Sequence, residues 1–315
     1  MRRPKSILFY RRFDRYSGGQ QKVFDYFCHA YAHLAVEPSI FWADGSLDMR
    51  STIWADHAQA LSPEYYPESA DAAFVAGLDW QAYLPARSRT AGQPVVNLIQ
   101  HVRHADPSSD VYPFLSERAV RICVSAEVEQ AILGTGRVNG PTFAIPNGID
   151  TAAITGFRQP KQPGSVYVLG NKQPQLATEL SSALVQQGLK VTCHAEHTLR
   201  DRVLRAMAQA EVCVLLPHRT EGFYLPALES MALDCLVIVP DCVGNRGFCQ
   251  DGVTCLMPAL SLASLLIAVG EARELLALGT ANTMIERAHK RVEQHSLSRE
   301  RSLFYDVLEN LDAIW

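Results

Sequence analysis

The sequence lacks several patterns that would each indicate a particular class of protein. No apolar run approaches the roughly 18 residues of a membrane-spanning helix, so no such helix is expected. None of the eight cysteines forms a Cys-x-x-Cys pair, which leaves little support for a zinc site. The Gly-x-Gly-x-x-Gly fingerprint of dinucleotide-binding proteins is absent. An Asp-x-Asp pair, which could carry a divalent metal ion, is absent as well.

The composition is that of a soluble globular protein, with 48% hydrophobic and 20% charged residues. The 315 residues are enough for two medium-sized domains, and the net charge of −4 gives no general attraction to nucleic acid. The cysteines indicate a reduced cytosolic protein, because several stand in apolar runs as small core residues. A metal or redox role for Cys235, Cys242, Cys249 and Cys255 is the less favoured alternative.

The N-terminal segment is basic. Only Ser6–Tyr10 follows it as an apolar run, which is too short for a secretory signal and predicts a first strand. The basic residues are either a solvated edge or a surface for an anionic lipid, a charged glycan or a phosphate-bearing acceptor. The second reading would bring a cytoplasmic protein to the periphery of the inner membrane. These residues are Arg2, Arg3, Lys5, Arg11, Arg12, Arg15 and Lys22.

Short apolar strands alternate with amphipathic helices along the whole chain. This alternation predicts an α/β fold with parallel sheets covered by helices on both faces. A segment rich in Gly and Pro, from Thr151 to Gly164, has the composition of a linker. Strands are expected at Ser6–Tyr10, Ser39–Trp42, Ala72–Val75, Pro94–Ile99, Arg121–Val124, Thr142–Ile145, Ser165–Leu169, Lys190–Cys193, Val212–Leu216 and Leu236–Val239.

The stretch Leu215–Ala232 has the pattern of a strand end, a polar loop and a helix that opens at Pro226. Such a helix start gathers free backbone N–H groups and the positive end of the helix dipole, which suits a phosphate. Glu221 and Glu229 bracket this point, and a carboxylate accepts hydrogen bonds from sugar or ribose hydroxyls. On spacing alone, an ordinary buried unit with two solvated glutamates is an equal alternative.

Two strings carry a family resemblance. Glu221–Ala232, read as Glu-Gly-Phe-Tyr-Leu-Pro-Ala-Leu-Glu-Ser-Met-Ala, closely resembles the signature of glycosyltransferase family 4. Ile145–Asp150 is similar to the string that closes the N-terminal domain in that family. The resemblance implies a GT-B fold, with two Rossmann-like doubly wound domains, residues 1–150 and 151–297, facing a central cleft. It also implies a last helix, residues 298–315, that crosses back to the N-terminal domain.

The same resemblance implies roles for residues of the second domain. Glu221 would face the donor sugar, and Glu229 would bind the nucleotide ribose. Most members have glycine where this chain has Tyr224, so its side chain is expected to alter the sugar pocket. The backbone amides that would hold the sugar and its diphosphate belong to Gly222, Phe223, Tyr224 and Leu225.

Three further loops resemble parts of the family's substrate site. Members usually carry an arginine and a lysine after the first strand of the second domain. This chain has Asn171 and Lys172 there, so Lys172 would hold the diphosphate and Arg219 could replace the missing arginine. The remaining residues implied by the resemblance are Gly244 and Asn245 in a turn near the sugar and phosphate, Gly18 and Gly19 in a loop near the diphosphate and acceptor, and His101, with His104 in reserve, near the donor sugar.

The sequence thus predicts a retaining, metal-independent glycosyltransferase without a cofactor. It would move a sugar from a nucleotide-diphosphate sugar to a hydroxyl of a glycan or lipid-linked acceptor, in bacterial surface polysaccharide synthesis. Two alternatives stay open. One is a non-catalytic sugar-nucleotide-binding or scaffold protein, which the missing arginine and Tyr224 would favour. The other is a GT-B epimerase that acts on the nucleotide sugar itself.

Overall fold

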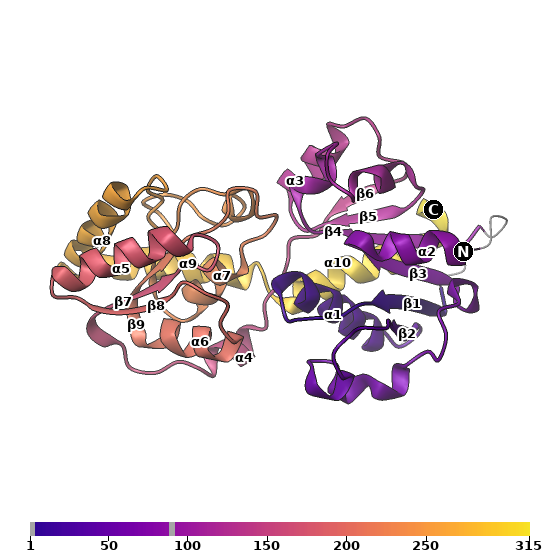
Figure 1. Cartoon of the computed structure of the whole chain (residues 1–315), viewed down its shortest axis with the longest axis horizontal. Helices are drawn as coiled ribbons and strands as arrows, with labels where there is room; N and C mark the ends of the chain where they lie inside the picture. Colours follow the sequence, from indigo (N-terminus) through magenta and orange to yellow (C-terminus); the bar gives the residue numbers. More distant parts are fainter. Residues whose placement is uncertain (1–3, 88–91) are drawn as a thin grey trace. The chain divides into compact units, whose positions relative to one another are not determined.

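The computed structural model describes residues 4–87 and 92–315. Arg2 and Arg3 of the basic segment lie outside the described residues. The chain forms two compact units (Figure 1). Unit 1 consists of Met1–Asn147 and Ser298–Trp315, and unit 2 of Gly148–Leu297. In the described ranges, no helix is both long enough and apolar enough to cross a membrane.

Unit 1 is built on a parallel sheet with the strand order β2-β1-β3-β4-β5-β6 in the described part of the chain. The inner strands β3 to β5 are buried on both faces, and their residues are apolar except for Asn97 in β4 and Arg121 in β5. The strands are β1 (Ser6–Arg11), β2 (Glu37–Trp42), β3 (Ala72–Ala76), β4 (Val95–Ile99), β5 (Val120–Cys123) and β6 (Thr142–Ala144).

Helices cover both faces of this sheet. Phe9 and Phe74 pack against α1 and α10 on one face, whereas Ala73 and Val75 pack against Trp80 of α2 on the other. The α-helices are α1 (Gly18–Tyr31), α2 (Trp80–Ala86), α3 (Ala126–Leu133), α10 (Leu297–Glu309) and α11 (Leu311–Ile314). The 3-10 helices are η1 (Met49–Ser51), η2 (Ala55–Ala60), η3 (Pro67–Ser69), η4 (Gly77–Asp79), η5 (Val102–Ala105) and η6 (Tyr112–Ser116).

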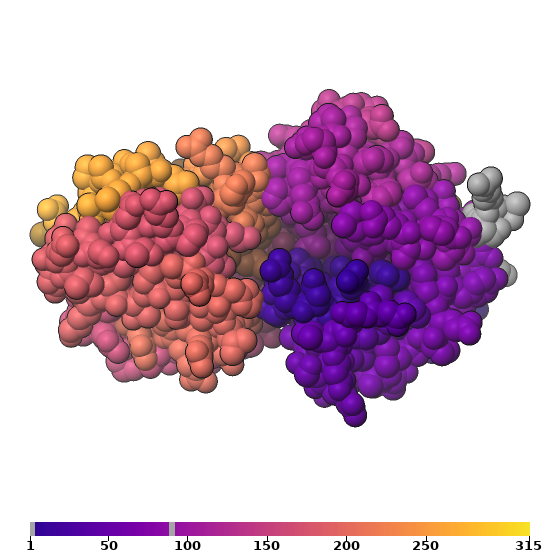
Figure 2. Space-filling model, in the orientation of Figure 1, coloured from indigo at the N-terminus to yellow at the C-terminus, as the bar shows by residue number. Residues whose placement is uncertain are grey.

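The C-terminal helix α10 is an internal part of unit 1. Lys22 of α1 is 1% exposed, and its Nζ lies 2.6 Å from Glu300 Oε2 and 2.7 Å from Asp25 Oδ2. The rings of Tyr26 and Phe304 meet edge to face at 4.9 Å. On the side of unit 1 that Figure 2 shows, the yellow C-terminal residues are hidden. A buried ion pair and an aromatic contact therefore join the two ends of the sequence.

Unit 2 repeats the architecture on a second parallel sheet, with the order β10-β9-β7-β8 in the described residues. Alternate residues of its strands face α4, α6, α7 and α9 on one side and α5 and α8 on the other. The strands are β7 (Gln162–Leu169), β8 (Lys190–His194), β9 (Ala210–Leu215) and β10 (Leu236–Ile238). The helices are α4 (Thr151–Thr155), α5 (Pro174–Gln186), α6 (Arg200–Gln209), α7 (Leu225–Ala232), η7 (Val243–Asn245), α8 (Leu262–Ala277) and α9 (Ala281–Glu293).

One segment differs from its prediction. Thr151–Gly164 is not an open linker, because it contains α4 and the start of β7. Asp150 caps α4 by accepting a hydrogen bond from the Ala153 amide at 2.9 Å, and Ile154 is fully buried in the core of unit 2. The prediction was wrong because it relied on the high Gly and Pro content and overlooked the short capped helix α4.

Candidate functional site

The candidate site of unit 2 lies at the carboxyl ends of its parallel strands, where ligands bind in open α/β sheets. The loop after β7 carries Lys172, and the loop after β9 carries Glu221. Lys172 Nζ lies 3.3 Å from Glu221 Oε1, with side-chain exposures of 48% and 19%. A cation and a carboxylate from two different loops therefore meet at one accessible place.

The loop that carries Lys172 depends on a glycine. A Cβ on Gly170 would lie 2.0 Å from the Cβ of Ala177 in α5, so only glycine lets the loop pass so close to that helix. Gly170 also donates its amide to His194 O at 2.9 Å and accepts the Gln173 amide at 2.8 Å. These contacts fix the turn from which the exposed Asn171 and Lys172 project.

Helices α5 and α7 both begin at this edge of the sheet, and each has proline in its first turn. Neither helix has a side-chain cap in the part of the chain that the structure describes. The amides of Gly222, Phe223 and Leu225 likewise have no hydrogen-bond acceptor among the described residues. Free N–H groups and the positive end of two helix dipoles would stabilise an anion here.

The loop after β9 is held in place by the loop after β10. Val243 donates its amide to Arg219 O at 3.1 Å, and Tyr224 donates its amide to Gly244 O at 3.0 Å. A Cβ on Gly244 would come within 2.7 Å of the backbone of Glu221 and Phe223, so a larger residue would separate the loops. Gly244 therefore positions the Glu221 loop by close backbone contact.

The side chain of Tyr224 points into the core of unit 2 and not toward the expected sugar pocket. Its side chain is 4% exposed and packs in the core of unit 2, and its amide is used by Gly244. Burial, followed by the charge of Glu221, raises the pKa of its hydroxyl well above the usual value. This corrects the expectation that the Tyr224 side chain reshapes the pocket, because the ring fills the protein interior instead.

Asn245 is also internal. Its side chain accepts the Cys242 amide at 3.1 Å and donates to Pro240 O at 2.9 Å, and the residue has no exposed surface. Its amide group therefore holds the loop after β10 rather than projecting toward a ligand. Arg219, by contrast, is exposed, and its charge acts on Asp241 in the loop after β10.

Glu229 lies in α7 and is 6% exposed. The guanidinium of Arg200, at the start of α6, donates from Nε at 3.1 Å and from Nη2 at 2.7 Å to Glu229 Oε1. Both bonds reach the same oxygen, and Oε2 receives neither of them. The sequence predictions missed Arg200. The sequence feature that could have identified it is its position, in the first turn of a predicted helix that follows β8 at the carboxyl edge of the sheet.

Unit 1 contains the other predicted residues. Gly18 and Gly19 open α1 behind Ser17, whose hydroxyl accepts the Gln20 amide at 3.2 Å. The side chain of Gln100, after β4, donates to Gly19 O at 3.3 Å. The Gly18–Gly19 loop and the loop that begins at Gln100 are thus in contact.

The two histidines of the β4 loop differ in environment. His101 is half-buried, and its Nδ1 accepts the Arg103 amide at 2.9 Å, so it caps η5. His104 is 3% exposed. Burial, followed by the charge of Arg103, lowers the pKa of His104 from 6.5 to about 3, so the ring is neutral at physiological pH. His101 is the more accessible of the two.

Cys123, Cys213 and Cys235 are core residues, as predicted, and are at most 1% exposed. Cys242, Cys249 and Cys255 are also buried, whereas Cys28 and Cys193 are only partly buried. Within residues 4–87 and 92–315, no group of three or more His, Cys, Asp or Glu side chains is arranged to hold a metal ion.

Comparisons with known proteins agree with this organisation. Residues 150–276, which lie entirely in unit 2, match the family model described as "Glycosyl transferases group 1". That range contains Lys172, Arg200, Glu221, Glu229 and Gly244. None of the curated protein sequences compared with the chain matches it.

Solved structures resemble the chain over both units. A glycosyltransferase from Rickettsia africae is 12% identical, with 97% of this chain and 98% of that chain covered and a TM-score of 0.70. HepE from Anabaena, solved in complex with UDP-glucose, is 14% identical, with 97% and 99% covered and a TM-score of 0.72. Sucrose-phosphate synthase from Thermosynechococcus elongatus is 16% identical, with 98% and 99% covered and a TM-score of 0.68. These similarities confirm the predicted α/β fold of the GT-B type, with two parallel-sheet units.

Proposed function

We propose that the protein transfers a sugar from a nucleotide-diphosphate sugar to an acceptor hydroxyl. One observation carries the proposal. Lys172 Nζ lies 3.3 Å from Glu221 Oε1, beside the uncapped start of α7 and inside the range that matches the glycosyltransferase model. HepE, a structural neighbour, binds UDP-glucose, which supports a nucleotide-sugar donor for this chain.

The diphosphate of the donor would bind Lys172 and the free amides of Gly222, Phe223 and Leu225. In the reaction, positive charge grows on the anomeric carbon and negative charge on the leaving diphosphate. Fixed N–H groups and an ammonium aimed at that diphosphate stabilise the transition state more than the ground state. The exposed guanidinium of Arg219 would add charge at the same place.

The two glutamates would hold the two sugars of the donor. Glu221 lies next to the diphosphate position and would accept hydrogen bonds from the transferred sugar. Glu229 would accept the ribose hydroxyls on Oε2, because Arg200 occupies Oε1. Arg200 would thus position the Glu229 carboxylate.

We propose transfer with retention of configuration, on the resemblance to family 4. The bond between the anomeric carbon and the diphosphate oxygen breaks, and the acceptor oxygen forms a new bond on the same face. The leaving phosphate oxygen takes the acceptor proton, so no separate protein base is required. The same resemblance is the ground for proposing that His101 and the Gly18–Gly19 loop contact substrate.

Further parts of the proposal rest on the family resemblance alone. Lys172 and the helix starts would supply the positive charge for which other transferases use a metal ion, so no metal or cofactor is expected. The acceptor would be a glycan or a lipid-linked glycan of bacterial surface polysaccharide synthesis. The protein would be cytoplasmic, with the basic N-terminal segment in contact with the inner membrane.

Release of free nucleoside diphosphate from a panel of nucleotide sugars tests the proposal. Turnover is expected with at least one donor. Lys172→Ala should reduce it about a hundredfold or more, because one charged donor to the leaving group is lost. The control Lys190→Ala removes an exposed lysine at the start of β8 and should leave turnover unchanged. Full activity of Lys172→Ala would contradict the role of Lys172.

A non-catalytic sugar-nucleotide-binding protein is the second candidate. The observation that favours it is that Lys172 and Arg200 are both paired within the protein, with Glu221 and Glu229. Binding of nucleotide sugars without any turnover, over a broad donor and acceptor panel, would support this candidate and overturn the proposed transfer. Interconversion of the sugar without an acceptor would instead indicate an epimerase.

A further inference from the structure

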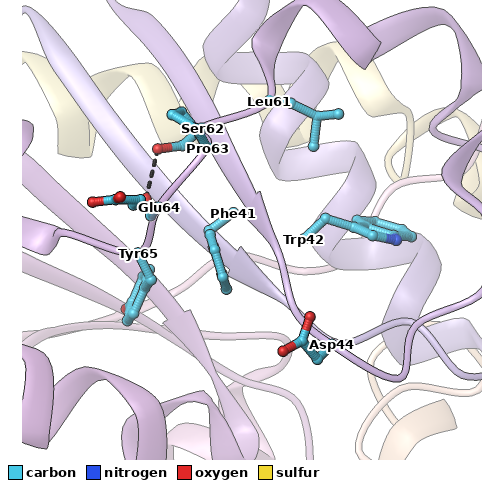
Figure 3. A pocket seen from close by; sticks show the side chains of 8 residues that line it. All are labelled: Phe41, Trp42, Asp44, Leu61, Ser62, Pro63, Glu64 and Tyr65. Carbon is cyan, nitrogen blue, oxygen red and sulfur yellow. Dashed lines mark hydrogen bonds between the residues drawn. The ribbon is translucent and has the colours of Figure 1, made fainter.

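Unit 1 contains a cavity of about 690 Å³, wide open to solvent, at the carboxyl end of its edge strand β2 (Figure 3). Phe41 and Trp42 line it from β2, where their side chains lie on opposite faces of the strand. The segment 61–65 also lines it and runs beside β2, since Ser62 donates its amide to Ile40 O at 2.8 Å. None of the residues assigned above to the donor or to catalysis lines this cavity.

Aromatic rings dominate the walls and are held in place. The rings of Phe41 and Tyr65 lie 5.4 Å apart, and both pack on Tyr10, at 5.8 and 4.8 Å. Trp42 is fixed because its indole Nε1 donates to Leu47 O at 2.9 Å. Phe41, Trp42 and Tyr65 line the cavity and are only partly buried. Rigid aromatic surface of this kind packs well against the C–H faces of a sugar ring at little cost in conformational entropy.

Polar groups stand beside these rings. Asp44 and Glu64 are exposed, and in the view of Figure 3 the ring of Phe41 lies between them. The segment that carries Glu64 is ordered by a hydrogen bond from Ser62 Oγ to Glu64 O at 2.7 Å. Each carboxylate can accept hydrogen bonds from two hydroxyl groups of one ligand. A few polar acceptors beside an apolar surface are the usual composition of a small-molecule site.

One cationic side chain lies close to the acids of the cavity. Arg12 reaches the loop that carries Asp44, because a Cβ on Gly45 would lie 3.6 Å from Arg12 Nη2. Arg11 Nη2 lies 3.4 Å from Asp79 Oδ1 behind Tyr10. Arg12 therefore offsets part of the acidic charge of the loop that carries Asp44, whereas the partner of Arg11 is Asp79, which does not line the cavity.

We infer that this cavity binds a sugar residue of an oligosaccharide acceptor, and this inference rests on the proposed function. Strand β2 is separated by three strand spacings, roughly 14 Å, from β4, whose loop carries His101. A single sugar ring is too short to span that distance. The reacting sugar would therefore lie toward the inner strands, and a sugar further along the acceptor chain would occupy the cavity.

The test uses the full-length protein and a panel of neutral linear oligosaccharides of glucose, galactose and N-acetylglucosamine. Binding is measured by saturation-transfer NMR and calorimetry, with tetramethylammonium as a cationic probe. The double variant Asp44→Asn, Glu64→Gln keeps the shape of the side chains and should weaken oligosaccharide binding roughly tenfold or more. Phe41→Leu should have a similar effect. Glu37→Gln, an exposed acid at the other end of β2, is the matched control and should bind like the wild type.

The outcomes separate the alternatives. Unchanged affinity in the double variant and in Phe41→Leu would overturn the cavity as a sugar site, as would the absence of oligosaccharide binding to the wild type. Tighter binding of tetramethylammonium than of any oligosaccharide would overturn the sugar assignment in favour of a cation site. Release of nucleoside diphosphate with water as acceptor should be equal in all variants. If the wild type binds oligosaccharides at the cavity but shows no donor turnover, the proposed transfer fails and the acceptor role fails with it, whereas the sugar site stands.

Discussion

At the scale of single residues, the site depends on two ion pairs of different character. Lys172 is 48% exposed beside Glu221, and such a pair contributes little to folding. Glu229 is 6% exposed and would be an uncompensated buried charge without Arg200. We therefore expect Lys172 to be available to a ligand and Arg200 to be committed to holding Glu229.

This difference predicts the behaviour of Arg200 variants. Arg200→Met leaves the carboxylate of Glu229 without its partner and should weaken nucleoside diphosphate affinity roughly tenfold. Arg200→Lys keeps the charge and should recover part of that loss. Titration calorimetry with UDP, GDP and ADP provides the affinities. The exposed Arg202, in the same helix, supplies the control Arg202→Met. Equal affinities in Arg200→Met and wild type would argue against a ribose role for Glu229.

His104 predicts a dependence of stability on pH. Its pKa is lowered from 6.5 to about 3, so the unfolded chain binds a proton between these values that the folded chain does not bind. The free energy of unfolding should therefore fall as the pH drops from about 6.5 toward 3. His104→Gln should reduce this slope, as measured by thermal unfolding over that range. Identical slopes in the variant and the wild type would show that His104 is not buried as a neutral ring.

At the scale of elements, the position of the Glu221 loop is set by the neighbouring loop. Two backbone hydrogen bonds join the loops, and Gly244 lies too close to Glu221 and Phe223 for a side chain. Gly244→Ala should thus displace Glu221 and reduce turnover at least tenfold, while the melting temperature changes by a few degrees at most. Gly247→Ala, with nothing within 4 Å of its built Cβ, is the control. Wild-type turnover in Gly244→Ala would contradict this coupling.

The elements also show what the sequence could predict. Strands buried on both faces, such as β3 and β9, could be predicted because they are short apolar runs in the sequence. The strand–loop–helix pattern correctly predicted that α7 begins near Pro226. Arg200 could be recognised as an arginine at the start of a predicted helix, but its pairing with Glu229 could not, because the pairing depends on α6 and α7 packing on the same face of the sheet. The inward direction of Tyr224 was equally hidden, since it follows from the hydrogen bond to Gly244 rather than from local residues.

At the scale of the whole molecule, the C-terminal segment completes unit 1. Burial opposes the charge on Glu300, but Lys22 and His29 outweigh it and hold the pKa of Glu300 below the ordinary 4.5. This group stabilises the folded state above pH 4.5, and the contribution is lost as the pH falls through its lower folded pKa. The last helix is thus part of the domain that the first residues begin.

Glu300→Gln should therefore destabilise unit 1 strongly, by about 3 kcal/mol or more, because Lys22 stays buried without one of its carboxylates. It should also remove the part of the acid sensitivity that arises from Glu300. Urea unfolding of the two proteins at neutral pH and near pH 4 provides the comparison. Glu309→Gln, in the same helix but with a half-exposed side chain, should change stability by less than about 1 kcal/mol. If the Glu300→Gln variant were as stable as Glu309→Gln, the buried ion pair of Lys22 and Glu300 would not be needed to hold α10 in unit 1.

The central claim is that a diphosphate binds at Lys172 and the uncapped start of α7. Amide chemical shifts of the isotope-labelled protein, recorded while UDP, GDP and ADP are added separately, test it most directly. We predict that at least one of these nucleotides shifts the amides of Gly222, Phe223 and Leu225, and that Lys172→Ala greatly weakens the effect. The claim would be contradicted if a nucleotide bound and shifted other amides of the protein but left those of Gly222, Phe223 and Leu225 unchanged.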